Sequence, residues 1–169
     1  VDSDPKTWCI DVDDCKAKLT SSTKAIIAVH LYNHLADVNG LMKLCKDHNL
    51  TLIEDCAHAH GSHWQGKAVG SWGKVGSFSF QQSKSMTAGE GGALVTSDQQ
   101  LAQKMAAIKN CGRAWEGGKV GFGGNYRISE FQAAVLLGQL DRINQQIQTR
   151  SSNLVLLSSL LDDIPGISV

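Results

Sequence analysis

The segment "SFSFQQSKSMTAGEGG" places a single lysine, Lys84, between an alternating apolar stretch and a glycine-rich turn. A lysine amine can form an imine with an aldehyde cofactor and thereby anchor that cofactor covalently. Most lysines, however, lie on solvated surfaces and have no further role. The chemical interpretation of Lys84 therefore depends on which other groups the fold brings close to it.

A carboxylate and a hydroxyl precede this lysine at positions that suit one cofactor. Asp55 ends an apolar stretch 29 residues before Lys84, and Ser79 lies five residues before it. Pyridoxal phosphate needs an anchoring lysine, a carboxylate at its ring nitrogen, and donors for its phosphate. Taken singly, Asp55 could be a cap and Ser79 an ordinary strand serine. Together with Lys84 they predict a pyridoxal-phosphate site, provided that they meet at one edge of a sheet.

Three histidines follow Asp55 in "CAHAHGSHW", and each could be an ordinary hydrogen-bonded loop residue. Asp55, His58, His60 and His63 also allow a second interpretation, a metal-dependent hydrolase. These histidines do not have the i, i+4 spacing with which one face of a helix binds a metal ion. The sequence also lacks an H-E-x-x-H helix motif.

The first half of the chain predicts a strand, a helix and a strand. The apolar runs "KAIIAVH" (24–30) and "LTLIEDC" (50–56) are typical of strands buried on both faces. Asp37 can cap the helix between them, whose apolar stripe is formed by Val38, Leu41, Met42 and Cys45. Such a unit implies parallel pairing with a right-handed crossover.

The second half contains further elements and one long loop. The irregular glycines of residues 57–76 predict a loop, whereas "SFSFQ" (77–81) and "GGALVTS" (91–97) predict strands. A helix should begin at the Ser97–Asp98 cap and stop at Gly112. A helical pattern from Ser129 to about Leu161 predicts either one kinked helix or two helices.

These elements predict an α/β fold with a mostly parallel sheet. Ligands of such sheets bind beyond the carboxyl ends of the strands. Asp55 and Lys84 lie at the ends of neighbouring predicted strands, so we expect both at the same edge of the sheet. This expectation favours Lys84 as a cofactor-binding residue over Lys84 as an ordinary surface lysine.

The composition excludes several other classes of protein. Sixteen basic residues balance sixteen acidic ones, so no basic field indicates nucleic acid or an anionic membrane as partner. No apolar run approaches the roughly 20 residues of a membrane span, and the N-terminus does not resemble a signal peptide. Five scattered cysteines without a C-x-x-C pair predict reduced thiols in a cytoplasmic protein.

The residues also resemble a known family. The stretch "IEDCAHAHGSHWQGKAVGSWGKVGSFSFQQSKSMTAGEGGALVTSD", with "TKAIIAVHLYNHLADV" before it and "GGNYRISEFQAAVLLGQL" after it, is similar to the DegT/DnrJ/StrS aminotransferases. These are pyridoxal-phosphate enzymes of the aspartate-aminotransferase fold, which has three α/β/α layers, and they aminate keto-sugars and keto-cyclitols. The resemblance implies that residues 1–148 are part of the large cofactor-binding domain. It implies that residues 149–169 are a linker helix and the start of the small domain, and that the fold is incomplete at both ends.

The resemblance also implies roles for individual residues. Lys84 would be the Schiff-base lysine and the acid/base of the proton transfer, and Asp55 would pair with the pyridine nitrogen. His58 would lie near the ring oxygen of the cofactor, and Ser79 would bind its phosphate. Asn125 would reach the phosphate of the neighbouring subunit's cofactor, so the active site would belong to a homodimer.

The implied reaction moves an amino group from glutamate or glutamine to a ketone. The acceptor would be a keto-cyclitol such as a scyllo-inosose, with nucleotide-linked keto-sugars as the alternative. Some sugar dehydratases of this superfamily carry His at the anchoring position, so Lys84 favours transamination. A non-catalytic or regulatory protein on the same scaffold is a further alternative, but such a role needs none of Asp55, His58, Ser79 and Lys84.

Overall fold

The computed structural model of the chain describes residues 1–32, 34–118 and 121–167. Its elements are, in chain order, α1 (Val12–Ala17), β1 (Ala25–Val29), α2 (Val38–Asp47), β2 (Thr51–Asp55), β3 (His63–Trp64), β4 (Lys67–Ala68), β5 (Val75–Ser79), β6 (Gly92–Val95), α3 (Gln99–Lys109) and α4 (Glu130–Leu161).

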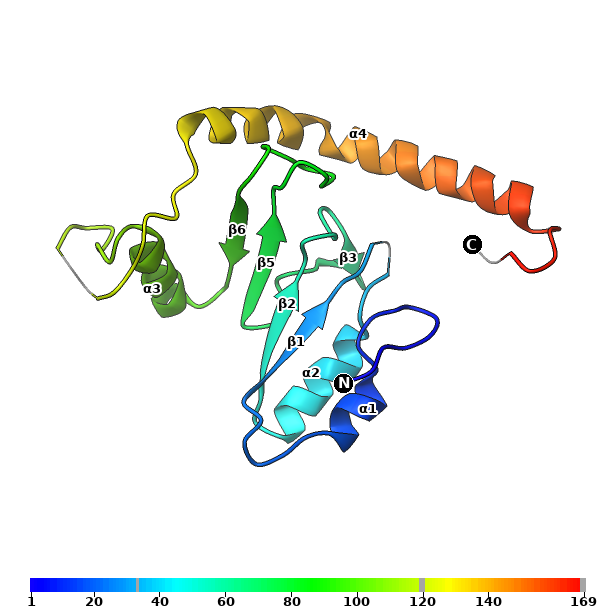
Figure 1. Ribbon diagram of the computed structural model, residues 1–169, viewed down its shortest axis with the longest axis horizontal. Coiled ribbons are helices and arrows are strands. Elements are labelled where there is room, and N and C mark those ends of the chain that lie inside the picture. The colour runs from blue at the N-terminus through cyan, green and yellow to red at the C-terminus, as the bar shows by residue number, and fades with distance from the viewer. Residues whose placement is uncertain (33, 119–120, 168–169) are drawn as a thin grey trace.

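The larger sheet has the strand order β1-β2-β5-β6 (Figure 1). β1, β2 and β5 run parallel, and β6 pairs antiparallel with β5. Strand β1 reaches β2 through α2, which is the expected parallel unit. The predicted α/β fold with a mostly parallel sheet is therefore confirmed.

Side-chain caps fix where three helices begin. The Asp37 side chain accepts a hydrogen bond from the Gly40 amide, as predicted for α2. The Asp98 side chain does the same for α3, and Ser129 forms a capping box with Gln132 at the start of α4. Each cap satisfies backbone N–H groups that have no partner within the first turn of a helix.

One face of the sheet is covered by helices and forms the main core. Ile26, Ala28 and Leu52 of the sheet belong to the same buried cluster as Leu41 and Leu44 of α2, and Cys15 of α1 joins them. The predicted stripe of α2 needs one correction. Met42 is 38% exposed and Leu44 is buried instead, because α2 packs on both the sheet and α1.

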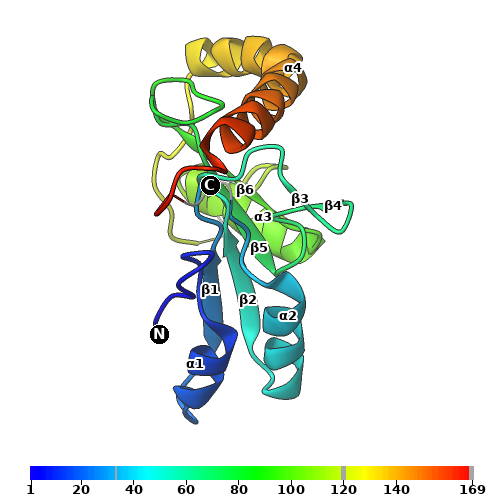
Figure 2. The same ribbon diagram turned by 90° about the vertical axis from the view of Figure 1, so that its right-hand side faces the viewer.

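The other face of β1 is open in the described part of the chain. Ile27 is 61% exposed and Val29 is 41% exposed, so β1 alternates between buried and exposed residues. Figure 2 shows β1 beside β2 in the sheet, with α2 next to them. The prediction that this strand is buried on both faces is therefore wrong for the residues described. The apolar side chains on both faces of "AIIAV" were read correctly as a strand, but only the face toward α2 receives a cover.

Three small elements, β3, β4 and α1, were not predicted. β3 and β4 form a two-stranded antiparallel hairpin inside the expected loop of residues 57–76. They comprise two residues each, too few for an alternating pattern to show. α1 is a six-residue helix whose N-cap is Asp11, and it is likewise too short for a clear stripe.

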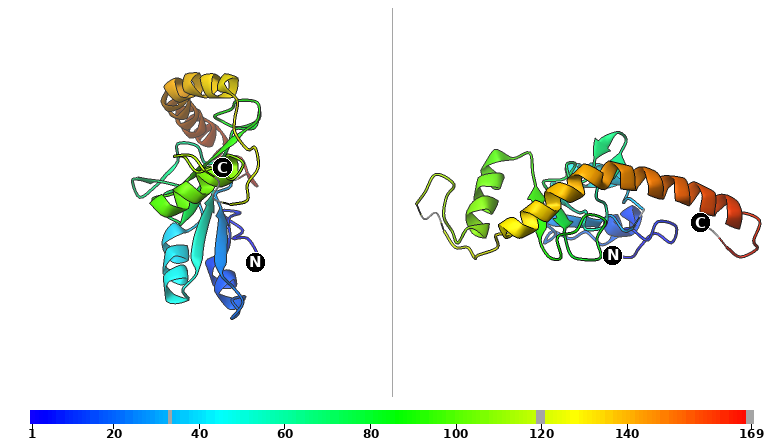
Figure 3. Two further views of the ribbon diagram at one scale, coloured as in Figure 1. Left: turned by 90° about the vertical axis from the view of Figure 1, so that its left-hand side faces the viewer. Right: turned by 90° about the horizontal axis from the view of Figure 1, so that it is seen from above.

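Helix α4 crosses the carboxyl edge of the sheet (Figures 1 and 3). The Gln132 side chain donates to the Glu90 carbonyl, and Arg150 donates to the Ser85 hydroxyl, so α4 is tied to both ends of the segment that follows Lys84. It is one continuous helix rather than two. The domain boundary expected at residues 148–149 falls inside α4, and the division into two domains stays a prediction.

None of the helices in the described residues is long and apolar enough to span a membrane. All five cysteines are free thiols, and four of them are buried.

Candidate active site at the carboxyl edge of the sheet

The carboxyl end of β2 presents Asp55 on the open face of the sheet. In the register of the sheet, Asp55 lies beside Val29 on one side and Ser77 on the other. The carboxylate is half-buried, and its Oδ1 accepts a hydrogen bond of 3.0 Å from the Ala57 amide. Its second oxygen has no hydrogen-bond partner among the described residues, so this oxygen can accept a hydrogen bond from a ligand.

The carboxyl end of β5 leads directly to the lysine. Ser79 is the last residue of β5 and lies on the same face as Asp55, because it is two residues beyond Ser77. The chain then turns, with the Lys84 amide donating to the Gln81 carbonyl at 3.0 Å. Lys84 is half-buried. Asp55 and Ser79 are thus the last residues of two neighbouring strands, and Lys84 follows Ser79 by five residues, which places all three at the carboxyl edge as expected.

His58 lies just beyond β2 and stacks on an aromatic ring that the sequence analysis missed. The rings of His58 and Tyr32 are 4.9 Å apart and nearly parallel, with 18° between their planes. Tyr32 has φ of 54°, an uncommon value for a residue with a side chain, and its side chain is 71% exposed. An aromatic residue directly after an apolar strand was the only signal that could have identified it. His58 Nδ1 is buried and has no partner within the described residues.

His60 is buried between aromatic side chains. Its ring lies 5.6 Å from that of Phe78 and 6.0 Å from that of Phe80, and the residue is only 9% exposed. Burial lowers the pKa of His60, and the nearby Lys84 and His58 side chains lower it further, against the opposing effect of the Ser79 carbonyl. His60 is therefore a neutral imidazole at pH 7.

The four residues of the metal-hydrolase interpretation do not gather. His63 lies on the β3–β4 hairpin, where it is exposed and its Nδ1 is 3.0 Å from the Gly61 carbonyl. In the part of the chain that the structure describes, Asp55, His58, His60 and His63 form no group close enough to share a metal ion. The geometry gives this interpretation no support.

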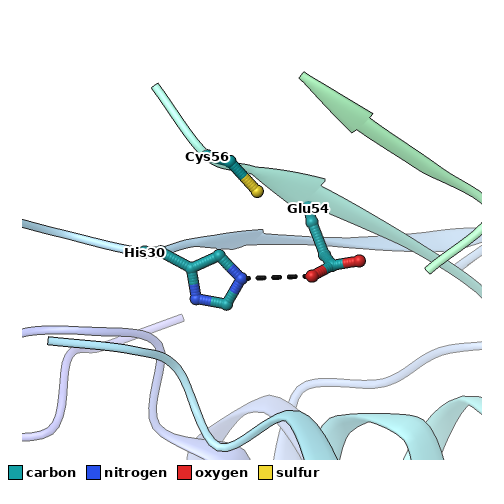
Figure 4. Close-up of side chains that lie close together, drawn as sticks. All are labelled: His30, Glu54 and Cys56. Carbon is teal, nitrogen blue, oxygen red and sulfur yellow. Dashed lines mark hydrogen bonds and ion pairs between the residues drawn. The ribbon is translucent and has the colours of Figure 1, made fainter. Parts of the chain in front are cut away.

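A different buried group lies directly behind the site (Figure 4). Glu54 accepts hydrogen bonds from the amides of Gly70 (2.7 Å), Trp72 (2.8 Å) and Gly73 (2.6 Å). His30 Nε2 is 3.3 Å from Glu54 Oε1, and both side chains are fully buried. The sequence analysis missed both residues, although a glutamate inside an apolar strand ("LIED") is a signal, because buried carboxylates require partners.

The tautomer of His30 follows from its second hydrogen bond. Its Nδ1 accepts a hydrogen bond of 3.1 Å from the Ala36 amide, so Nδ1 carries no hydrogen. A neutral ring then has its hydrogen on Nε2, where it is donated to Glu54. The contact is thus a hydrogen bond from a neutral imidazole to a carboxylate.

This group is not suited to a metal, although His30, Glu54 and Cys56 lie within 4.8 Å of one another. A metal on Nε2 would displace the only hydrogen of His30 and would compete with three backbone amides for Glu54. Burial, with the nearby charges of Glu54 and Asp55, raises the pKa of the Cys56 thiol to about 12. Cys56 is therefore a protonated, unreactive packing residue.

The sequence profile of the DegT/DnrJ/EryC1/StrS aminotransferase family matches residues 1–169. The chain belongs to this family.

Relatives of known name and structure agree with this assignment. The chain is 45% identical over 179 residues to the L-glutamine:2-deoxy-scyllo-inosose aminotransferase of Streptomyces kanamyceticus, covering 96% of this chain and 41% of that enzyme. The crystal structure of 3-amino-5-hydroxybenzoic acid synthase matches 98% of this chain and 44% of its own, with a TM-score of 0.91 and 40% identity. The structure of S. venezuelae DesV with a ketimine intermediate matches 98% of this chain and 45% of its own, with a TM-score of 0.92 and 34% identity.

The chain therefore spans about two fifths of the length of the curated relative named above. Within that part, the comparisons confirm the family resemblance and the fold class expected from the sequence.

Asn125, the remaining predicted site residue, lies in the loop between α3 and α4. It pairs with Asn110 in an isolated antiparallel bridge, and its Oδ1 accepts a 2.9 Å hydrogen bond from Arg127 Nε. The residue is exposed. Its expected contact is with a second subunit, so its role stays a prediction.

The side chains at the carboxyl edge fit the cofactor of this family. Asp55 offers an unpaired carboxylate oxygen, and His58 offers a buried Nδ1 without a partner in the described chain. The Ser79 hydroxyl accepts from the Gln81 amide at 3.3 Å, which leaves its own hydrogen to donate to an anion. This set matches a ring nitrogen, a ring oxygen and a phosphate.

Proposed function

We propose that this chain is the central part of a pyridoxal-phosphate-dependent aminotransferase that acts on a keto-cyclitol or a keto-sugar. The observation that carries the proposal is the presence of Asp55, Ser79 and Lys84 at one edge of one parallel sheet, with two of them on the same face. Membership of the aminotransferase family supports it.

Five residues would hold the cofactor. Lys84 would anchor it through Nζ, and Asp55 would accept a hydrogen bond from its protonated ring nitrogen. His58, held flat by Tyr32, would lie at the ring oxygen, and Ser79 would donate to the phosphate. Asn125 of a second subunit would complete the phosphate site, so the working unit would be a homodimer. When bound, the cofactor supplies an electron sink for the carbon that gains or loses the amino group.

The residues of the chain then have distinct tasks. Lys84 Nζ would accept and donate a proton as general acid and base during transfer of the amino group. Asp55 would favour the protonated form of the ring nitrogen of the cofactor, since an opposite charge within hydrogen-bond distance favours the charged form. His60 stays neutral beside Lys84 and so adds no positive charge to the edge.

The substrates are proposed from the relatives. The Streptomyces kanamyceticus enzyme is named for L-glutamine and 2-deoxy-scyllo-inosose, which supports glutamine or glutamate as donor and a cyclic polyol ketone as acceptor. A nucleotide-linked keto-sugar is the second candidate. The balanced charge makes nucleic acid and membrane unsuitable partners, and the free thiols support a cytoplasmic location.

The test uses the full-length protein incubated with pyridoxal phosphate. We expect an absorbance band near the edge of the visible range, and borohydride should fix the cofactor to the peptide that contains Lys84. Addition of L-glutamine should then convert the bound cofactor to its amino form, and 2-deoxy-scyllo-inosose should reverse the change. A folded, dimeric protein without the band would overturn the cofactor assignment. A band that no amino donor alters would favour a regulatory protein on the same scaffold.

A further inference from the structure

The buried Glu54 carboxylate connects three separate segments of the chain. It belongs to β2, it accepts three amides from residues 70–73, and it accepts the ring hydrogen of His30 at the end of β1. Each of the three segments leads within a few residues to the candidate site. β2 continues into Asp55, the loop of residues 70–73 leads into β5, and His30 precedes Tyr32 by two residues.

We propose that Glu54 and His30 are positioning residues of the active site, which set the direction of the Asp55 carboxylate and the placement of the Tyr32–His58 stack. Neither residue would touch substrate or cofactor. This inference rests on the proposed function, since it concerns how the cofactor-binding edge is held.

The first step concerns β2 itself. Consecutive strand residues point to opposite faces, so fixing the Glu54 side chain on one face fixes where Asp55 points on the other. Four donors surround the Glu54 carboxylate, and it is 0% exposed, so its position has little freedom. The carbonyl of Asp55 also accepts from the His30 amide at 3.0 Å, which adds a second tie at the same point.

The second step concerns the start of β5. A Cβ on Gly73 would meet the Leu52 carbonyl, a Cβ on Gly76 would meet the backbone of Gly70, and a Cβ on Gly70 would meet the ring of Phe78. Glu54 binds the backbone amides of Gly70 and Gly73 within this close packing. The strand that carries Ser79 and leads to Lys84 therefore starts from a position set by Glu54.

The third step concerns the stacked pair at the mouth of the site. His30 directly follows β1, and its Nδ1 accepts a hydrogen bond from the Ala36 amide. His30 therefore connects the two ends of the turn that carries Tyr32. The turn is closed by the His34 amide, which donates to the Leu31 carbonyl at 2.9 Å. Tyr32 holds a left-handed backbone conformation there, which persists only when its surroundings enforce it.

The experiment compares three variants of the full-length protein with an exposed control. Glu54→Gln replaces one acceptor oxygen by an NH₂ group, which would face the backbone amides or the His30 ring hydrogen that Glu54 now accepts. His30→Gln retains a donor near the Nε2 position but loses the acceptor for Ala36. His30→Asn retains an acceptor near the Nδ1 position but loses the donor to Glu54. Glu116→Gln, on an exposed loop, controls for the loss of one carboxylate.

Three readouts separate positioning from mere stabilisation, all measured well below each variant's melting temperature. They are the dissociation constant of pyridoxal phosphate, the pH at which the absorbance of the bound cofactor changes, and the separate effects of each substitution on kcat and on KM. If Glu54 positions Asp55, Glu54→Gln should weaken cofactor binding by at least about tenfold and lower kcat by about 100-fold, because small misplacements at a reacting centre have large effects. The pH of the absorbance change should shift, and Glu116→Gln should match the wild type.

The histidine variants keep the proposal testable if Glu54→Gln does not fold. His30→Asn, which breaks the bond to Glu54, should shift the absorbance titration more than His30→Gln does. Amide hydrogen exchange in the cofactor-free protein should become faster at residues 70–73 in His30→Asn. Variants that melt earlier but keep wild-type cofactor affinity, absorbance titration and kcat would overturn the proposal. A wild type that binds no pyridoxal phosphate would instead overturn the proposed function, so the two failures are distinguishable.

Discussion

Glu54 and Asp55 are consecutive residues of β2, yet their carboxylates lie in opposite surroundings. Glu54 is fully buried and accepts four hydrogen bonds, whereas Asp55 is half-buried and accepts one, from the Ala57 amide. One carboxylate is thus satisfied by the protein, and its neighbour keeps an oxygen for a ligand. This difference separates a residue that holds the edge of the sheet from one that can act there.

Lys84→Ala should abolish the covalent attachment of pyridoxal phosphate, because no other amine is predicted at this position. Turnover should fall by roughly 100- to 10,000-fold, the usual contribution of a general acid–base group. Borohydride treatment followed by peptide mapping checks the attachment, and Lys104→Ala, an exposed lysine on α3, is the control. A cofactor still fixed to the protein of the Lys84 variant would refute the anchoring role.

Asp55→Asn should keep the shape of the side chain but lose the charge that protonates the ring nitrogen of the cofactor. We expect kcat to fall by roughly 100-fold or more, as when one preorganised electrostatic contact is removed from an active site. The absorbance spectrum of the bound cofactor should change as well. Full activity in this variant, measured with glutamine as donor, would remove Asp55 from the mechanism.

Asn125→Ala should weaken retention of the cofactor across the subunit interface. The loss of one hydrogen bond to a charged phosphate corresponds to a dissociation constant about tenfold higher. Dialysis of the dimer followed by absorbance measures it, with Asn144→Ala on the exposed surface of α4 as the matched control. Equal affinities in the two variants would count against a role for Asn125.

Cys56→Ser should leave kcat nearly unchanged, because the Cys56 thiol is protonated and has no chemical role. The structure adds an expectation for stability. Cys56 is 0% exposed and packs in a cluster with Ala59 and Val69, where a hydroxyl must be buried. The free energy of unfolding should fall by about 1–3 kcal/mol. Denaturant unfolding checks this, and a large loss of activity in a stable variant would contradict the assignment.

His60 should make stability depend on pH. Burial lowers its pKa in the folded state, so below the ordinary value of 6.5 the unfolded chain binds a proton that the folded chain does not. The stability that this neutral histidine contributes is present above pH 6.5 and is lost as the pH falls toward the lowered value. The slope is at most about 1.4 kcal/mol per pH unit. His60→Phe should remove this part of the slope between pH 6.5 and 5, and identical slopes in both proteins would show that His60 does not titrate this way.

The sequence predicted the elements whose signals are local and repeated. Two apolar runs and the helix cap Asp37 predicted the parallel unit of β1, α2 and β2. The alternating stretch before Lys84 predicted a strand there and so placed Lys84 beyond the end of β5. The family could be identified because the segment from Asp55 to Glu90 contains a carboxylate, a histidine, a serine and a lysine in one characteristic spacing, at Asp55, His58, Ser79 and Lys84.

The parts that the sequence did not predict depend on contacts between distant residues. Glu54 and His30 are 24 positions apart, and their pairing follows only from the register of β1 and β2. Tyr32 meets His58 for the same reason. Met42 was wrongly predicted to belong to the buried stripe, and Leu44 is buried without having been predicted, because α2 also packs on α1, which is too short to show a pattern.

Helix α4 also has a mechanical consequence. It has 32 residues, which corresponds to about 48 Å measured along its bent axis (Figure 1), and Arg150 joins it to Ser85, the residue next to Lys84. The eleven residues from Arg150 to the end of α4 extend about 17 Å beyond this joint. A rotation of about 5° at Arg150 would move the tip at Leu161 by about 1.4 Å on this geometry. The contact between Arg150 and Ser85 therefore links the C-terminal part of α4 to the turn that carries Lys84.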